Sequence, residues 1–328
     1  MIEQEAARRQ KTGLIVQTWG VYLGLAALLA VSAVVSPRSF NAQDLLNLAK
    51  QASGLGIVSI GQTLVILTGG IDLSVGSIIT LVHVFLVGTI MGRPEMVLPV
   101  ALLCVLLGSV IGAINGIGIT RARISPFVMT LCMDFIVRGL YMIYTKGQPS
   151  GVVPENLRFI GRGRILSVVP VAAIIWIVLS LLFVFLLRRT IFGARLYAVG
   201  ANPRTAWLSG VRNPRIIFLT YTLTGFLAAV AGLILTGDMG AVSLGLGGDY
   251  AMDSIAATVI GGTTFTGGIG GIEGTIAGSF IIRLLASLLQ KANPAVFDDV
   301  YTISPTTVLN VGYSYSRFIR AQNASIRW

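Results

Sequence analysis

The sequence has few charged residues. Only 11% of its 328 residues are charged, whereas soluble proteins average about 25%. A soluble domain of this length needs Asp, Glu, Lys and Arg to cover its surface, so this scarcity excludes an ordinary soluble enzyme. Because 54% of the residues are hydrophobic, the predicted solvent for most of the chain is the lipid bilayer.

Cysteine and histidine are also scarce. Cys104 and Cys132 lie in apolar stretches without the spacing of a metal motif or a disulfide framework, and we expect both to be packing residues. His83 is the only histidine and has no nearby carboxylate or second ligand, so we expect a packed residue rather than a proton relay. The Cys and His residues thus predict no metal site in this chain.

Long apolar runs are abundant. A membrane-spanning helix needs about 20 apolar residues. The first run, 15–36, follows a basic cluster and is interpreted as an uncleaved signal anchor. Eight further segments lie at 50–68, 74–92, 96–119, 124–144, 166–187, 216–237, 251–266 and 272–290. The sequence predicts an all-α polytopic membrane protein with about nine transmembrane or re-entrant helices, and leaves open whether 251–266 spans.

Basic residues are unevenly divided between the two sides of this topology. The side that holds residues 1–14, 120–123 and 188–215 has eleven Lys and Arg, and the opposite side has seven. Cytoplasmic loops are enriched in these residues, so the N-terminal segment 1–14 is predicted to be cytoplasmic. The net charge of +11 is then attributed mainly to loops near membrane lipid, and no nucleic-acid partner is expected.

Glycine spacing and a short internal match both suggest a transporter. Glycines recur every four residues at Gly20/Gly24, Gly108/Gly112/Gly116 and Gly270/Gly274/Gly278, a spacing typical of close helix packing in membranes. Residues 69–80, GGIDLSVGSIIT, match residues 267–278, GGIGGIEGTIAG, at five of twelve positions. A match this short can arise by coincidence. If it is a genuine repeat, duplicated halves with broken helices are typical of transporter folds.

Polar residues within the apolar segments are candidates for function because burying them in a membrane is costly. Asp134 is followed one turn later by Arg138, which indicates a self-neutralised pair. Asp72 either caps the helix that begins near Ser74 or lines a hydrophilic path. The candidate path residues are Gln62, Thr63, Asp72, Ser74 and Asn115; the uncharged ones could equally form interhelical hydrogen bonds.

The loop 188–215, RRTIFGARLYAVGANPRTAWLSGVRNPR, is long and contains six Arg and no acidic residue. Pro203 fits the first turn of a short helix with Asn202 as its N-cap, and Gly210 fits its end. This predicts a two-turn amphipathic helix at the membrane surface. It either rests on lipid headgroups or docks onto a cytoplasmic partner.

Three stretches resemble a known family: GQTLVILTGGIDLSVGSIITL (61–81), GARLYAVGANPRTAWLSGV (193–211) and IGGTTFTGGIGGIEGTIAGSF (260–280). They look like the membrane permease subunit of bacterial ABC importers for ribose-type monosaccharides, within the branched-chain amino acid/ribose-type permease superfamily. The resemblance covers roughly residues 15–290, the expected permease domain. It places the chain in the bacterial inner membrane.

The resemblance implies a transport subunit that is not an enzyme and that has no catalytic or cofactor-binding residues of its own. Its expected partners are a separate ATPase that binds ATP and Mg²⁺, a periplasmic sugar-binding protein and a second permease subunit, identical or paralogous. The expected substrate is a monosaccharide of the ribose, xylose, arabinose or galactose class. The residues expected to couple to the ATPase are Gly200, Asn202, Pro203, Arg204, Ala206, Ser209 and Gly210.

The C-terminal tail, 291–328, departs from the family pattern of about ten helices. It is polar, is interrupted by Pro294 and Pro305, and has no run able to cross a bilayer. A frame change, a truncation or a divergent periplasmic tail would each explain it. This departure leaves a non-transporting permease remnant as one alternative function. An ion-coupled secondary transporter is another, suggested by Asp72, Asp134 and Asp253.

Overall fold

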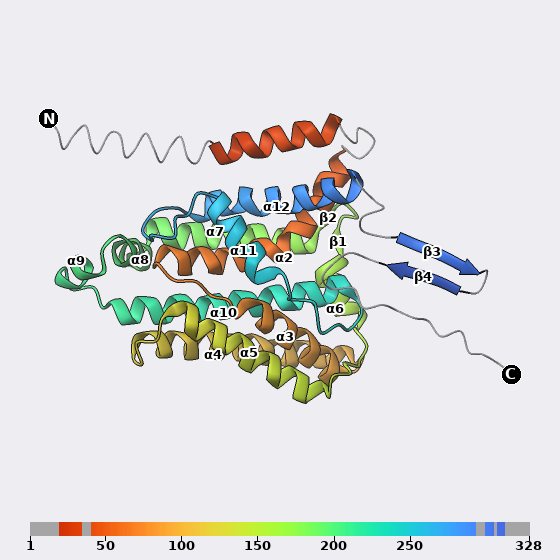
Figure 1. The fold of residues 1–328 in the computed structure, drawn as a ribbon, viewed down its shortest axis with the longest axis horizontal. Coiled ribbons are helices and arrows are strands. Elements are labelled where there is room, and N and C mark those ends of the chain that lie inside the picture. The colour runs from red at the N-terminus through yellow and green to blue at the C-terminus, as the bar shows by residue number, and fades with distance from the viewer. Residues whose placement is uncertain (1–19, 35–40, 293–298, 305–306, 312–328) are drawn as a thin grey trace.

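The computed structural model describes residues 20–34, 41–292, 299–304 and 307–311 (Figure 1). Within them the chain is a bundle of helices with two short strand pairs. After a first helix, Gly20–Val34, the elements are α2 (Ala42–Leu67), α3 (Val75–Ile90), η2 (Pro94–Met96), α4 (Val97–Thr120), α5 (Pro126–Thr145), α6 (Glu155–Arg162), β1 (Arg164–Ile165), β2 (Val169–Pro170), α7 (Val171–Arg189), α8 (Ile191–Ala201), α9 (Pro203–Leu208), α10 (Asn213–Met239), α11 (Tyr250–Ile260), α12 (Ile272–Ala292), β3 (Asp299–Ser304) and β4 (Thr307–Val311). The prediction of an all-α polytopic membrane protein is confirmed.

The helix α2 forms the core of the bundle. It packs against α7, α10, α11 and α12, and every residue from Ala52 to Leu67 is buried. A helix that is apolar on all sides is stable only when it is covered all round. The neighbouring helices therefore take the outer positions, where lipid or a partner meets their exposed apolar side chains.

Glycines allow the helices to approach closely. A Cβ on Gly108 would lie 2.6 Å from the carbonyl oxygen of Gly225, so α4 and α10 cross in direct main-chain contact. Gly274 and Gly278 of α12 meet the main chain of α11 in the same way. The predicted packing role is confirmed for these series, but it is wrong for Gly20 and Gly24, where a Cβ would have no atom of the described residues within 4 Å.

Five helices in the described residues are long and apolar enough to cross a membrane: those that contain α4, α5, α7, α10 and α12. The shorter apolar helices in the described residues include α3 and α11. α3 has 16 residues and α11 has 11, which correspond to about 24 and 16 Å at 1.5 Å per residue. The segment 251–266 is therefore not one spanning helix, because α11 ends at Ile260 and the chain continues as turns to Gly271.

The two copies of the possible repeat adopt similar local structures. Gly69 and Gly267, which are aligned with each other, have φ angles of 78° and 81°. Each begins an irregular stretch that leads into a helix, α3 in the first copy and α12 in the second. The two stretches are neighbours, because Gly268 N donates a hydrogen bond to the Leu67 carbonyl oxygen at 2.9 Å. α3 and α12 then run toward the same end of the bundle (Figure 1).

Several local features differ from the sequence predictions. Between the fifth predicted span and α7 the chain forms α6 and the β1–β2 pair, and α7 begins at Val171 rather than at 166. Cys104 is buried as predicted, but Cys132 is exposed, so its packing role was wrong. In the tail, β3 and β4 pair antiparallel. The ends of the predicted signal anchor and most of the tail lie outside the described residues.

Candidate functional site: a projecting helix and a polar groove

The loop between α7 and α10 folds into two helices that project from one end of the bundle (Figure 1). The predicted helix is α9, and its cap is as expected: the Asn202 side chain accepts hydrogen bonds from the main-chain N–H groups of Arg204 and Thr205, both at 3.0 Å. Pro203 occupies the first turn, and Gly210 follows the helix with a φ of 81°. The preceding helix, α8, was not predicted.

One side of α9 is anchored and the other is free. Ala206 is buried, and Asn213 Nδ2 donates a hydrogen bond to the Pro203 carbonyl oxygen at 2.7 Å. On the outer side, Trp207 and Leu208 are 66% and 70% exposed. Large apolar side chains at such a tip are typical anchors of a protein interface. Neither of them was predicted from the sequence.

Basic residues surround the base of this element. A cavity of about 320 Å³ is lined by Arg195, Gly210, Arg212, Arg215 and Ile216. No acidic residue lies in the segment 188–215 itself. The nearest acidic pairing is at the end of α7, where Arg188 Nε lies 2.5 Å from Glu273 Oε1. The surface formed by α8, α9 and the start of α10 is therefore strongly positive.

The end of α8 touches both copies of the repeat. A Cβ on Gly200 would collide with the Leu67 carbonyl oxygen and lie 2.5 Å from Gly268 N. Leu67 ends α2 just before the break that leads to α3, and Gly268 precedes α12. A displacement of α8 and α9 would thus act directly on the entrances of α3 and α12.

Four of the five predicted path residues form one buried cluster. Asp72 Oδ1 accepts hydrogen bonds from Ser74 N at 2.9 Å and from Ser74 Oγ at 2.6 Å. Asn115 Nδ2 donates to Ser74 Oγ at 3.0 Å, and the Gln62 amide lies within 3.3 Å of the Asp72 main-chain N–H. All four side chains are fully buried. Asp72 therefore caps the start of α3, the first of the two roles considered from the sequence.

Thr63 lies apart from this cluster. Its hydroxyl is 2.7 Å from that of Thr275 on α12 and 3.4 Å from that of Thr258 on α11. These contacts join α2 to the second half of the chain. None of the five predicted path residues lines the cavities described next.

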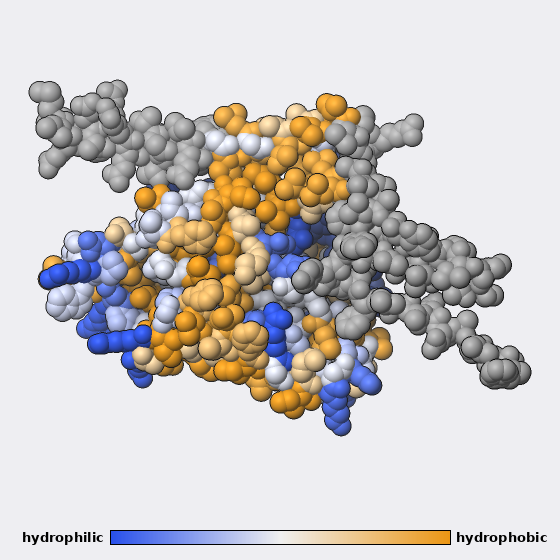
Figure 2. Space-filling view, in the orientation of Figure 1, coloured by the Kyte–Doolittle hydropathy of each residue, from blue (hydrophilic) through white to orange (hydrophobic). Residues whose placement is uncertain are grey.

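A polar groove lies instead between α3, α5, α11, α12 and the loop 240–249. One cavity of about 330 Å³ is lined by Ser77, Thr80, Arg138, Tyr141 and loop residues that include Ser243, Gly247 and Asp249. A second, of about 210 Å³, shares Ser243 and Asp249 with it and extends to Asp253 and Arg283. Figure 2 shows hydrophilic surface interrupting the apolar band in the middle of the molecule.

The charges of this groove lie at mid-span. Arg138 is near the middle of the 20-residue α5, and Arg283 is near the middle of the 21-residue α12. Arg138 Nε lies 2.8 Å from Asp134 Oδ2, which confirms the predicted pair. Arg283 Nη2 lies 3.6 Å from Asp253 Oδ2. Ion pairs inside a membrane domain are characteristic of polar pathways.

The loop 240–249 is held in place by two side chains of α3. His83 is fully buried; its Nε2 accepts a hydrogen bond from Ser243 N at 3.0 Å, and its Nδ1 lies 3.0 Å from Thr236 Oγ1. Thr80 Oγ1 accepts from Gly247 N at 3.0 Å. The expected packed role of His83 is confirmed. Tyr141, Asp249 and Arg283 had no signal in the sequence, because only the tertiary fold brings them together.

Comparison with known proteins agrees with this architecture. Residues 45–304 match the family described as the branched-chain amino acid transport system permease component. The chain is 39% identical to the ribose import permease protein RbsC of Bacillus subtilis over 285 residues, 86% of this chain and 88% of that protein. No solved structure matches.

Two further relatives are similar over most of their length. The probable ABC transporter permease protein YphD of Escherichia coli is 36% identical over 82% of this chain and 80% of its own. The fructose import permease protein FrcC of Rhizobium meliloti is 34% identical over 79% of this chain and 74% of its own. The chain therefore belongs to the branched-chain amino acid transport system permease family, as a multi-pass permease subunit of an ABC importer and not an enzyme.

Proposed function

We propose that this permease forms the translocation path for a monosaccharide of the ribose, xylose, arabinose or galactose class. The names of the similar proteins, which are ribose and fructose import permeases, support a sugar substrate. In this proposal the chain lies in the bacterial inner membrane with residues 1–14 and α9 in the cytoplasm. A periplasmic binding protein delivers the sugar, and a second permease subunit completes the path.

The observation that carries the coupling proposal is the projecting element α8–α9. It combines a positive surface with the exposed anchors Trp207 and Leu208. Such a surface suits a groove on a separate ATPase, which would bind ATP and Mg²⁺. The seven coupling residues expected from the sequence lie from the end of α8 to Gly210, beside these two anchors.

The mechanism in this proposal is alternating access. ATP closes the ATPase dimer, and α9 transmits the movement through α8 as a rigid lever. The contact of Gly200 with Leu67 and Gly268 passes the movement to the entrances of α3 and α12. The path between the two permease subunits then opens to the opposite side. The buried cluster at Asp72 holds the start of α3 during this change.

The family match favours this proposal over the two alternatives. An ion-coupled transporter would need carboxylates placed along a path, but Asp134 and Asp253 are paired with arginines and Asp72 lines neither cavity of the polar groove. The family match also argues against a non-transporting remnant. It continues through residue 304, whereas the resemblance found in the sequence ended at residue 290. The domain limits 1–14, 15–290 and 291–328 stay a proposal.

Reversing the charge of α9 is expected to weaken ATPase binding. The variant Arg204→Glu should retain about tenfold less ATPase on co-purification, equivalent to about 1.4 kcal/mol, because it reverses a positive charge at the docking surface. Trp207→Ala should have a similar effect through the loss of an apolar anchor. Retained ATPase is measured by quantitative immunoblotting of the purified complex.

The matched control is Arg93→Glu, the same reversal in the turn between α3 and α4. It should leave ATPase binding unchanged, because this turn lies near α6, at the opposite end of the bundle from α9 (Figure 1). Full retention in Arg204→Glu, or an equal loss in Arg93→Glu, would contradict the assignment of α9 as the docking helix.

A further inference from the structure

We propose that the larger cavity of the polar groove is a subsite for a neutral sugar ring, in which Arg138 and Tyr141 bind the ring hydroxyls. This inference rests on the proposed transport function and assigns that function a location. The cavity, of about 330 Å³, falls within the range of small-molecule sites, which begins at about 300 Å³.

The cavity lies where two short helices begin. α3 starts at Val75 and α11 starts at Tyr250, and the two starts are adjacent, because a Cβ on Gly76 would lie 2.5 Å from the Gly247 oxygen and 3.8 Å from Ala251 N. Half-helices of this kind meet at substrate sites of many transporters. The close approach of Gly76 and Gly247 forms a tight floor beneath the cavity.

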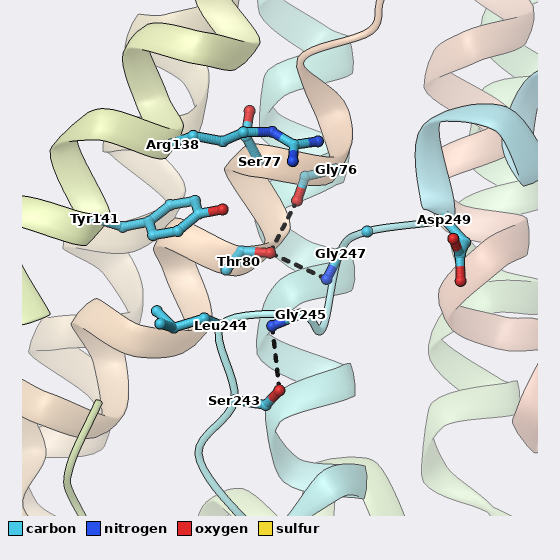
Figure 3. Close-up of a pocket in the computed structure, with 11 residues that line it drawn as sticks. Gly76, Ser77, Thr80, Arg138, Tyr141, Ser243, Leu244, Gly245, Gly247 and Asp249 are labelled. Atoms are coloured by element: carbon cyan, nitrogen blue, oxygen red, sulfur yellow. Dashed lines mark hydrogen bonds between the residues drawn. The ribbon is translucent and has the colours of Figure 1, made fainter. Parts of the chain in front are cut away.

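The walls of the cavity are fixed by hydrogen bonds. Thr80 Oγ1 donates a hydrogen bond to the Gly76 carbonyl oxygen at 3.2 Å and accepts one from Gly247 N at 3.0 Å (Figure 3). Ser243 Oγ accepts a hydrogen bond from Gly245 N at 3.1 Å. The main-chain N–H of Ser243 donates a hydrogen bond to His83 Nε2. A wall fixed in this way needs no reordering when a ligand enters, which reduces the entropic cost of binding.

Several hydrogen-bonding groups remain available in the cavity. The Tyr141 hydroxyl and the Asp249 carboxylate form no hydrogen bond or ion pair with another described residue, and Arg138 uses only Nε, toward Asp134. Figure 3 shows Arg138 and Tyr141 extending from α5 toward α3 and Gly247. Donors and an acceptor thus face one cavity, which matches hydroxyl groups that both donate and accept.

The charge of the lining favours a neutral ligand. Arg138 is already neutralised by Asp134 at 2.8 Å, and Asp249 adds a carboxylate to the wall. An anion would meet the Asp249 carboxylate, and a cation would meet the positive ends of the two helices that begin at the cavity, α3 and α11. A sugar ring carries no charge and is repelled by neither group.

The exposure of Arg138 indicates that the cavity opens to water. Its side chain is 49% exposed, although it lies near the middle of a spanning helix. Placing an arginine side chain against lipid at the bilayer centre is energetically unfavourable. This face of α5 therefore borders an aqueous path rather than lipid, as a translocation subsite requires.

The test is the variant Tyr141→Phe, which removes one hydroxyl from the cavity. The permease is reconstituted in proteoliposomes with its ATPase and ribose-loaded binding protein. Uptake of labelled ribose should fall about 3- to 10-fold, the size expected for one lost hydrogen bond. ATP hydrolysis stimulated by the loaded binding protein should not change, because the hydroxyl lies away from α9.

The matched control is Tyr144→Phe, the same substitution one turn later on α5, where the hydroxyl lies 3.2 Å from Thr89 Oγ1 outside the cavity. It should leave uptake unchanged. Equal uptake in the two variants would overturn the subsite, and so would a parallel loss of uptake and stimulated hydrolysis in Tyr141→Phe. A wild type that lacks both ATP-driven uptake and stimulated hydrolysis would instead overturn the proposed function, and the subsite with it.

Discussion

Replacing Gly200 with alanine is expected to reduce transport more than tenfold. The new Cβ would collide with the Leu67 carbonyl oxygen and lie 2.5 Å from Gly268 N and 3.1 Å from Gly268 Cα. These are main-chain atoms, which cannot move aside as a flexible side chain can. Overpacking of this kind costs about 1–3 kcal/mol, and here it separates α8 from the entrances of α3 and α12.

This prediction is measured as ATP-driven uptake in proteoliposomes at equal permease content. Gly139→Ala is the control, because Gly139 is also helical and has no described atom within 4 Å of its Cβ position. Uptake in Gly200→Ala within twofold of the wild type would show that the junction does not transmit the movement of α9.

Replacing Gly112 with valine is expected to disrupt the fold. Its Cβ would collide with the Tyr221 carbonyl oxygen and lie 3.0 Å from the Tyr221 carbonyl carbon and 3.2 Å from Gly225 Cα. The crossing of α4 and α10 cannot adjust without separating the helices. The loss of stability should reach the upper end of the about 1–3 kcal/mol typical of overpacking.

The readouts are purified yield and the temperature at which half of the detergent-solubilised protein aggregates. Gly139→Val on α5 provides the same change of residue type at an open position and should lower this temperature far less. If both variants aggregated at the same temperature, helix propensity rather than the α4–α10 contact would explain the loss.

Features set by local chemistry could be predicted from the sequence. The α9 helix follows from Asn202, Pro203 and Gly210, because a cap, a first-turn proline and a terminal glycine act within a few residues. The pair Asp134–Arg138 follows from helical spacing alone. The glycine series of α4 and α12 signalled close packing, although only the structure identifies their partners.

Features set by tertiary contact could not be predicted. The hydropathy of 251–266 resembles that of a span, and α11 ends early because Gly261 and the following turns pack on α12 and α8. α6 is short and amphipathic, so it gives no span signal. The polar groove was not predicted because its residues come from α3, α5, the loop 240–249, α11 and α12, and only the tertiary fold brings these elements together.

The predicted path residues show why a candidate site needs the tertiary structure as well as the sequence. A buried polar residue in an apolar helix is equally consistent with a path and with a structural contact. In the fold, Asp72, Ser74 and Asn115 bond to one another away from both cavities, whereas Tyr141 and Asp249 line the larger cavity. Sequence position alone does not distinguish a buried polar contact from a residue that lines a cavity.

The central claim is that sugar import is driven by ATP through a separate ATPase. The most direct test measures labelled ribose uptake by proteoliposomes that contain the permease, its ATPase partner and loaded binding protein. Uptake is predicted to require ATP and the ATPase and to be unaffected by collapse of the proton gradient. Uptake driven by the gradient in the absence of the ATPase would contradict the account.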